Sequence, residues 1–261
     1  MATSAPYAET LRRPQPCDHL IQLYTDEGFL GRAVGAFLGA GLAGGEAAVI
    51  IATPPHAALF RERLAADGLD VAAAEARGQL VVRDAQASLG AFMVDGMPDR
   101  DRFRALVTPV LAYITASGFG RTRLYGEMVD LLWNHSLPAT VALEQLWNEV
   151  LAETRVSLLC AYGIDTFDRQ IQRGVLHQIT ACHTELIPVE DYGRLERAVD
   201  LAYADVFGSA GEATLLREHM VARYKAATKM PAPQAALLAL RDVAPLVADS
   251  LVDRARFHFQ S

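Results

Sequence analysis

Short runs of apolar residues, separated by segments of helical periodicity, place the strongest constraint on the fold of this chain. Residues 47–52 read Ala-Ala-Val-Ile-Ile-Ala, and residues 156–162 read Val-Ser-Leu-Leu-Cys-Ala-Tyr. Runs without polar alternation are typical of strands that are buried on both faces. Further strands are predicted at 19–24, 79–83 and 121–127. Strands that alternate with helices predict an α/β fold, with a mostly parallel sheet covered by helices on both faces.

The segments between these runs carry apolar residues at helical spacing. Helices are predicted at residues 27–42, 54–66, 71–77, 101–117 and 138–152. After residue 167 no further buried strand is predicted. The remaining helices are predicted at residues 171–186, 192–207, 211–228 and 233–258, and Pro245 is expected to kink the last of them.

This change of pattern predicts three regions. Residues 1–16, which are rich in proline, are expected to form an irregular lead-in. Residues 17–169 are expected to form the α/β domain, and residues 170–261 a helical C-terminal region. Amphipathic helices bury their apolar face against whatever surface fits. The C-terminal region is therefore expected either to form a homodimer or to dock a partner protein.

Composition excludes several classes of protein. The formal net charge is -7, and the 24 basic residues are scattered, so no direct nucleic-acid partner is expected. Three separated cysteines fit a reducing compartment. The N-terminus lacks an apolar signal-peptide core. The most apolar region, residues 33–60, is interrupted by Glu46 and Pro54-Pro55, so no membrane span is expected there. We therefore expect a cytoplasmic protein.

An ordered series of short motifs resembles a known family. The series includes His19-x-x-x-x-Tyr24, Tyr125-Gly-Glu-Met-Val-x-Leu-Leu-Trp133, Leu143-Glu-x-Leu-Trp-Asn148 and Leu158-Leu-Cys-Ala-Tyr162. Across residues 17–167 the chain resembles the MEDS domain, a sensory domain named after methanogens, methylotrophs and the dichloromethane-responsive regulator. The resemblance implies a degenerate RecA/KaiC-like core that senses small hydrocarbon derivatives. It also implies a signalling partner, such as a kinase or a transcription regulator.

The turn after the first predicted strand lacks the features of a nucleotide-binding P-loop. Such a loop needs a glycine-rich turn and a lysine to hold phosphates. Here the turn reads Thr25-Asp-Glu-Gly-Phe29, with two carboxylates, one glycine and no lysine. These carboxylates would repel phosphate, so ATP hydrolysis by the usual route is disfavoured.

The candidate ligand-binding residues lie where strands end, because ligands of α/β proteins usually bind at the carboxyl ends of the strands. They are His19, Tyr24, Tyr125, Gly126, Glu127 and Trp133. Gly126 is expected to permit a sharp turn or a close backbone approach. Each candidate has a structural alternative. Glu127 could pair with Arg121 or Arg123, or act as a favourable charge at a helix N-terminus. His19 could be a satisfied structural group, and the aromatic side chains could belong to the core.

No metal site, cofactor or catalytic residue is predicted. Cys160, within an apolar strand, is expected to be an inert buried thiol. His177, Cys182 and His183 do not share one helical face, and a tetrahedral site needs a fourth ligand. No G-x-S-x-G nucleophile elbow is present.

These observations lead to three functional hypotheses. The first is a non-enzymatic signalling protein that senses a small ligand in its α/β core and regulates a partner through its helical tail. The second is a residual nucleotide-binding protein or ATPase of the RecA/KaiC lineage. The third is a ligand-free scaffold for protein interactions.

Overall fold

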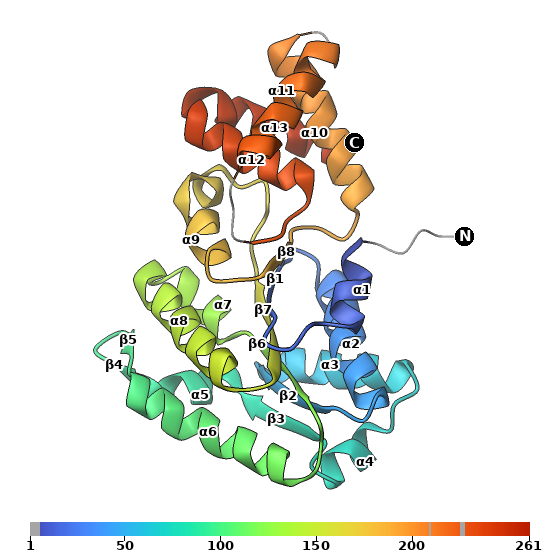
Figure 1. Cartoon of the computed structure of the whole chain (residues 1–261), viewed down its shortest axis with the longest axis vertical. Helices are drawn as coiled ribbons and strands as arrows, with labels where there is room; N and C mark the ends of the chain where they lie inside the picture. The colour runs from blue at the N-terminus through green and yellow to red at the C-terminus, as the bar shows by residue number, and fades with distance from the viewer. Residues whose placement is uncertain (1–5, 209, 225–227) are drawn as a thin grey trace.

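A six-stranded parallel sheet forms the centre of the computed structural model, which describes residues 6–208, 210–224 and 228–261 (Figure 1). The strand order is β3-β2-β6-β7-β1-β8, and every neighbouring pair runs parallel. The strands are β1 His19–Leu23, β2 Ala47–Ala52, β3 Leu80–Asp84, β6 Thr122–Gly126, β7 Val156–Tyr162 and β8 Glu185–Ile187. Two short strands, β4 Met93–Val94 and β5 Met97–Pro98, form an antiparallel hairpin. The predicted α/β fold is confirmed.

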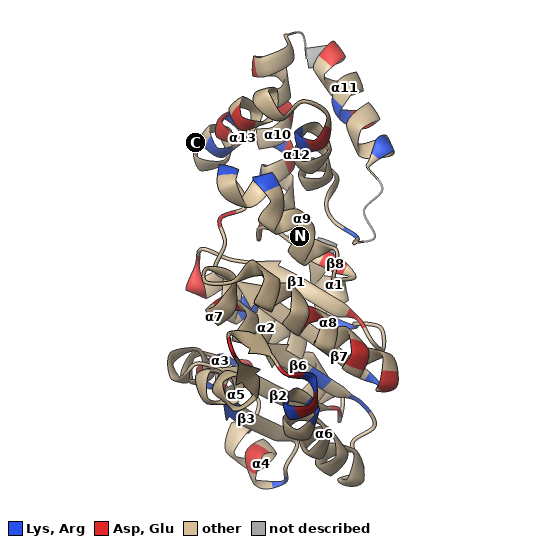
Figure 2. Ribbon diagram, turned by 90° about the vertical axis from the view of Figure 1, so that its left-hand side faces the viewer, with Lys and Arg blue, Asp and Glu red and all other residues tan. Residues whose placement is uncertain are grey.

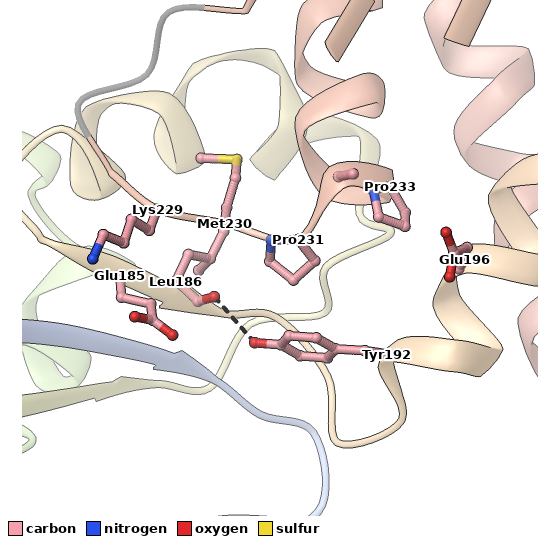
Figure 3. A pocket seen from close by; sticks show the side chains of 9 residues that line it. Glu185, Leu186, Tyr192, Glu196, Lys229, Met230, Pro231 and Pro233 are labelled. Carbon is pink, nitrogen blue, oxygen red and sulfur yellow. Dashed lines mark hydrogen bonds between the residues drawn. The ribbon is translucent and has the colours of Figure 1, made fainter. Parts of the chain in front are cut away.

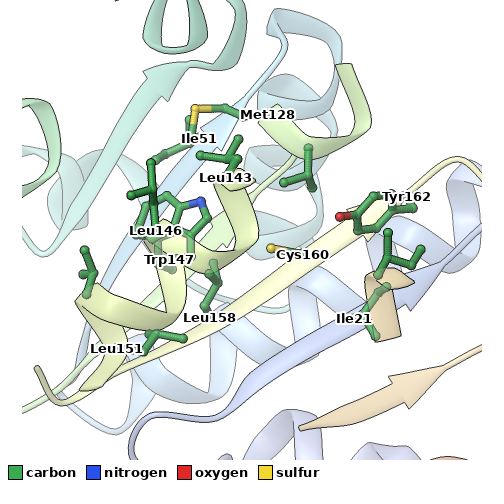
Figure 4. Packing of buried hydrophobic residues seen from close by; sticks show 14 of the residues in the cluster. Ile21, Ile51, Met128, Leu143, Leu146, Trp147, Leu151, Leu158, Cys160 and Tyr162 are labelled. Atoms are coloured by element: carbon green, nitrogen blue, oxygen red, sulfur yellow. The ribbon is translucent and has the colours of Figure 1, made fainter. Parts of the chain in front are cut away.

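Helices cover both faces of the sheet and enclose two apolar clusters. One face is covered by α1 Pro6–Arg12, α2 Glu27–Ala43, α3 Pro54–Ala66 and α4 Val71–Ala76. The other is covered by α5 Ala85–Phe92, α6 Arg100–Ala116, α7 Met128–Trp133 and α8 Leu137–Glu153. Trp147 of α8 is fully buried against the sheet, and Cys160 and Tyr162 belong to the same cluster (Figure 4).

A helical region with its own apolar cluster lies at one end of the molecule (Figure 2). It comprises α10 Tyr192–Phe207, α11 Ala210–Arg223, α12 Ala232–Val243 and α13 Pro245–Gln260. Along the ribbon in Figure 2, acidic and basic residues are interspersed. Among the described residues, no helix has the length and apolar character that a membrane span requires.

The structure corrects the sequence-based prediction at four places. A strand does follow residue 167, because β8 pairs with β1. The helix predicted at 171–186 is instead a short π-helix, Ile171–Val175, then α9 Leu176–Thr180 and the loop to β8. The lead-in contains α1, while residues 1–5 lie outside the described part. The helix predicted at 233–258 is broken at Ala244, not merely kinked, and Pro245 begins a new helix.

Candidate functional site

Glu127 is held by three donors at the carboxyl edge of the sheet. Its carboxylate follows β6 and is only 2% exposed. It accepts hydrogen bonds from the Thr53 backbone N–H at 2.5 Å and from the Tyr125 hydroxyl at 2.9 Å. His56 Nδ1 lies 2.5 Å from Glu127 Oε2. Glu127 therefore joins the turn after β2 to the turn after β6.

Neither arginine considered from the sequence pairs with Glu127. Arg123 forms an ion pair with Glu46 at 2.5 Å and also donates to the backbone carbonyls of Leu11 and Phe37. Arg121 lies 3.7 Å from Glu46. The predicted pairing of Glu127 with Arg121 or Arg123 is therefore wrong. Glu127 pairs instead with His56, which lies in the first turn of α3, after β2.

His56 bridges a buried and an exposed carboxylate. Its Nε2 lies 2.8 Å from Glu27 Oε2, while its Nδ1 faces Glu127. The hydrogen bond with Glu127 raises the pKa of His56, and the charges of both carboxylates add to this effect. Burial and the Glu127 charge raise the pKa of Tyr125 well above its ordinary value, so its hydroxyl remains a donor.

Asp130 accepts hydrogen bonds from the two remaining aromatic residues that were predicted, Tyr24 and Trp133. It accepts hydrogen bonds from the Tyr24 hydroxyl at 3.2 Å, from Trp133 Nε1 at 2.9 Å and from the Gly163 N–H at 2.7 Å. Burial raises the pKa of Asp130 despite these donors. The Tyr24 ring also contacts His56 edge-on, with 6.1 Å between the ring centroids. Tyr24 and Trp133 thus belong to the same polar edge as Tyr125 and Glu127.

Gly126 does not have the special backbone that the sequence suggested. It is the last residue of β6 and is not among the residues with a positive φ. A Cβ added there would make only ordinary van der Waals contacts, 3.7 Å from Leu124 Cδ2 and 3.9 Å from Leu158 Cδ1. The expectation of a glycine-dependent turn or close approach is therefore wrong.

His19 lies apart from the other five predicted residues. It begins β1, whereas Tyr24 follows the end of that strand. Side chains alternate along a strand, so His19 faces α8 together with Ile21 and Leu23. There it contacts Asn148, Cys160 and Glu144 in a fully buried cluster that also includes His183.

A cavity of about 540 Å³ lies between the carboxyl end of β1 and the helical region; we call it the junction cavity. Arg194 of α10 borders it and stacks on the ring of Phe259 from α13, 5.2 Å from the centroid. Of the six predicted residues, Tyr24 lines it. Its full lining comprises Leu23, Tyr24, Thr25, Asp26, Phe29, Ile164, Asp165, Thr166, Phe167, Pro188, Val189, Glu190, Asp191, Arg194, Phe259 and Gln260.

Carboxylates at the rim of the junction cavity have partners within the protein. Glu190 forms a two-pronged ion pair with Arg32, with both distances 2.7 Å. Asp165 accepts a hydrogen bond from Arg256 at 2.7 Å. Asp26 caps α2 by accepting from the backbone N–H groups of residues 28 and 29 at 3.0 and 2.9 Å. A carboxylate therefore occupies the position where a P-loop would bind phosphate.

A second cavity, of about 370 Å³, lies beside β8 where α10 and α12 begin (Figure 3). Tyr192 donates a hydrogen bond to the carbonyl oxygen of Leu186 there, at 3.3 Å. The boundary between the sheet and the helical region thus contains two cavities.

Sequence reasoning missed several residues of these sites. His56 and Asp130 are central to the carboxyl edge, and Glu144 and His183 are central to the buried cluster around His19. A signal was present for Asp130, which stands three residues before Trp133 on a helix, a spacing that brings side chains together. Glu144 also carried a signal, since it is a charged residue within the apolar face of its helix.

Comparison with known proteins identifies one family. The family described as the methanogen/methylotroph, DcmR sensory domain (MEDS) matches residues 18–184. This match covers the sheet as far as the residue before β8. No curated protein matches the chain.

Proposed function

Because the chain belongs to the MEDS family of sensory domains, we propose that it is a non-enzymatic signalling protein that binds a small ligand in the junction cavity. The helical C-terminal region would then carry the response to a partner protein. Family membership supports the sensory role. The ligand, its site and the partner are our proposal.

The shared lining of the junction cavity carries this proposal. Leu23 and Tyr24 come from the sheet side, whereas Arg194 and Phe259 come from α10 and α13 of the helical region. A ligand in this cavity would contact both regions. It would therefore favour the arrangement that closes around it, because a ligand shifts a conformational equilibrium only through differential contacts.

The lining favours a small ligand without negative charge. Apolar walls are provided by Phe29, Ile164 and Phe167, and several carboxylates stand at the rim. Asp26 already occupies the N-terminus of α2, so the backbone N–H groups of residues 28 and 29 are not available to a phosphate. A neutral hydrocarbon derivative suits these walls better than a nucleotide does.

The polar edge would act as the support of the site. Tyr24 lines the cavity and donates to Asp130, which also holds Trp133 and Gly163. Its ring contacts His56, the partner of Glu127. In this proposal Tyr24 contacts the ligand, whereas Glu127 does not reach the junction cavity.

Thermal-shift measurements with small halogenated compounds, C1–C2 compounds and nucleotides test the proposal. A compound present at about 100 times its Kd would stabilise the folded state by about 2.7 kcal/mol. Val189→Trp, which places a large ring in the cavity, should abolish this stabilisation. Native mass spectrometry of freshly purified protein would detect a retained ligand.

Glu127→Gln provides the contrasting variant, because Glu127 does not line the junction cavity. A compound that stabilises the Val189→Trp protein as strongly as the unsubstituted protein would contradict the proposed site. A compound that fails to stabilise Glu127→Gln but still stabilises Val189→Trp would indicate a binding site at the turn after β6. Stabilisation by ATP would favour the nucleotide hypothesis, and no binding at all would favour the scaffold.

A further inference from the structure

Four potential metal ligands meet in a buried cluster on the α8 face of the sheet. They are His19 from β1, Glu144 from α8, Cys160 from β7 and His183 from the loop before β8. One ligand atom from each lies within 4.8 Å of the others. The exposed fractions are 1% for His19, 0% for Glu144 and Cys160, and 4% for His183. Figure 4 shows Cys160 on its strand, among apolar residues of the same core such as Leu143 and Leu158.

The separations among His19 Nε2, Glu144 Oε2 and Cys160 Sγ suit one face of a tetrahedron around an ion, and His183 Nε2 faces the other oxygen of the same carboxylate. His19 Nε2 lies 3.4 Å from Cys160 Sγ and 3.2 Å from Glu144 Oε2. His183 Nε2 lies 3.3 Å from Glu144 Oε1, and Cys160 Sγ lies 3.7 Å from Glu144 Oε2. A tetrahedron with zinc–ligand bonds of about 2.0–2.3 Å has ligand atoms about 3.3–3.8 Å apart.

Outer hydrogen bonds turn both imidazole rings so that Nε2 points into the cluster. His183 Nδ1 donates to the Ile179 carbonyl oxygen at 2.7 Å. His19 Nδ1 faces Asn148 Oδ1 at 2.9 Å, and Asn148 Nδ2 donates to the Cys182 carbonyl oxygen. This amide orientation makes His19 Nδ1 the donor. Metal-binding histidines show the same arrangement, with one nitrogen bonded to an oxygen and the other free for the ion.

Without a cation, the cluster has too few protons. Glu144 accepts from the Tyr162 hydroxyl and the Cys160 thiol, but the buried His183 Nε2 has no hydrogen-bond partner among the described residues. Because its Nδ1 donates to Ile179, a neutral His183 has a bare lone pair on Nε2, 3.3 Å from Glu144 Oε1. A buried polar atom without a partner destabilises the folded state. A bound cation would satisfy it.

We propose that His19, Glu144, Cys160 and His183 bind one zinc(II) ion through Nε2, a carboxylate oxygen, Sγ and Nε2. The charges balance, because one thiolate and one carboxylate neutralise the divalent ion while both histidines remain neutral. Four protein ligands leave no open position, as in structural zinc sites. The Tyr162 hydroxyl, which donates to Glu144, would hold the carboxylate in place.

The site would connect the sheet to the helical region. His183 precedes β8, and its carbonyl oxygen accepts a hydrogen bond from the Thr228 hydroxyl at 2.8 Å. Thr228 stands directly before Lys229, whose backbone exchanges hydrogen bonds with residues 184 and 186 at 2.8 and 2.7 Å. Zinc would therefore fix the loop before β8. Through the hydrogen bonds of Thr228 and Lys229, it would also fix the segment that leads into α12. This inference does not depend on the ligand proposed for the junction cavity.

Metal analysis of the full chain tests the site. Protein refolded with zinc should contain about one zinc per chain. Refolding with cobalt(II) should give the visible bands of a tetrahedral ion and a near-ultraviolet thiolate-to-cobalt band. Cys160→Ser should lose the thiolate band, and Asn148→Ala should weaken binding about 10–100-fold. The cobalt spectrum of the unsubstituted protein gives a result even where a variant does not fold.

Neighbouring residues of the same types supply matched controls. Cys182→Ser and His177→Gln should keep both the zinc and the cobalt bands, because neither residue belongs to the cluster. Two results would overturn the proposal. One is unsubstituted protein that takes up no zinc or cobalt on refolding. The other is a Cys160→Ser protein that retains the full metal content and an unchanged cobalt spectrum.

Discussion

At the scale of single residues, the His56 bridge predicts a particular pH dependence of stability. The folded state raises the pKa of His56 through Glu127 and Glu27, whereas the unfolded value is about 6.5. A raised pKa means that protonated His56 adds to the free energy of unfolding in full below about pH 6.5. This added stability is lost as the pH rises through the folded-state pKa. The stability difference between the unsubstituted protein and His56→Gln should therefore be largest on the acidic side and shrink as the pH rises above about 6.5.

Urea denaturation at several pH values measures this difference. His135→Gln is the matched control, because His135 is exposed, and it should leave the pH profile unchanged. Profiles of the unsubstituted protein and His56→Gln that run parallel across this range would show that the bridge does not couple protonation to folding.

The sequence predicted which candidate residues lie close together only where those residues stand at the ends of strands. Tyr24, Tyr125, Glu127 and Trp133 converge because parallel strands end at one edge of the sheet. The partner of Glu127 could not be predicted, since His56 belongs to a different strand-to-helix turn. The cluster around His19 draws on residues up to 164 positions apart, and its assembly depends on the pairing of β1 with β7, where Ile21 faces Cys160.

At the scale of elements, the start of α2 depends on one carboxylate. Asp26 accepts from two backbone N–H groups, whereas Thr53, at the start of α3, makes no side-chain cap. Asp26→Ala should lower the free energy of unfolding by about 1 kcal/mol, and Asp26→Asn should retain most of it. Thr53→Ala is the control and should cost less. Equal losses in Asp26→Ala and Thr53→Ala, measured by urea denaturation, would contradict the capping argument.

The longer elements were predictable, and so was the short helix α4, whereas β8 and α1 were not. The strands of five to seven residues and the helices that cover them follow from apolar runs and helical spacing. β8 has only three residues, too few to display a period, and it forms because β1 presents a free edge for pairing. α1 was missed because prolines flank it, although its Leu11 is buried against the sheet-facing cluster.

At the scale of the whole molecule, the exposed apolar side chains gather on the helical region. Of the seven large apolar residues that are exposed in the described part, five lie there: Leu201, Leu215, Val243, Leu246 and Phe257. Leu246 is 92% exposed, at the start of α13 and near Val243 at the end of α12. Exposed apolar surface favours association because burial stabilises by about 25 cal/mol per Å². We therefore expect the chain to form a homodimer through this region.

Sedimentation velocity over a range of concentrations tests this expectation, with Leu246→Asp as the disrupting variant. A charge on the contact surface would lose its water on association, so the variant should remain monomeric at concentrations where the unsubstituted protein dimerises. Met97→Asp is the control, because Met97 is an exposed apolar residue of the β4–β5 hairpin, away from the helical region. Dimers that persist in Leu246→Asp would place the interface elsewhere. An unsubstituted protein that stays monomeric at all concentrations would contradict the homodimer. The apolar surface would then be the candidate contact for the partner protein of the signalling proposal.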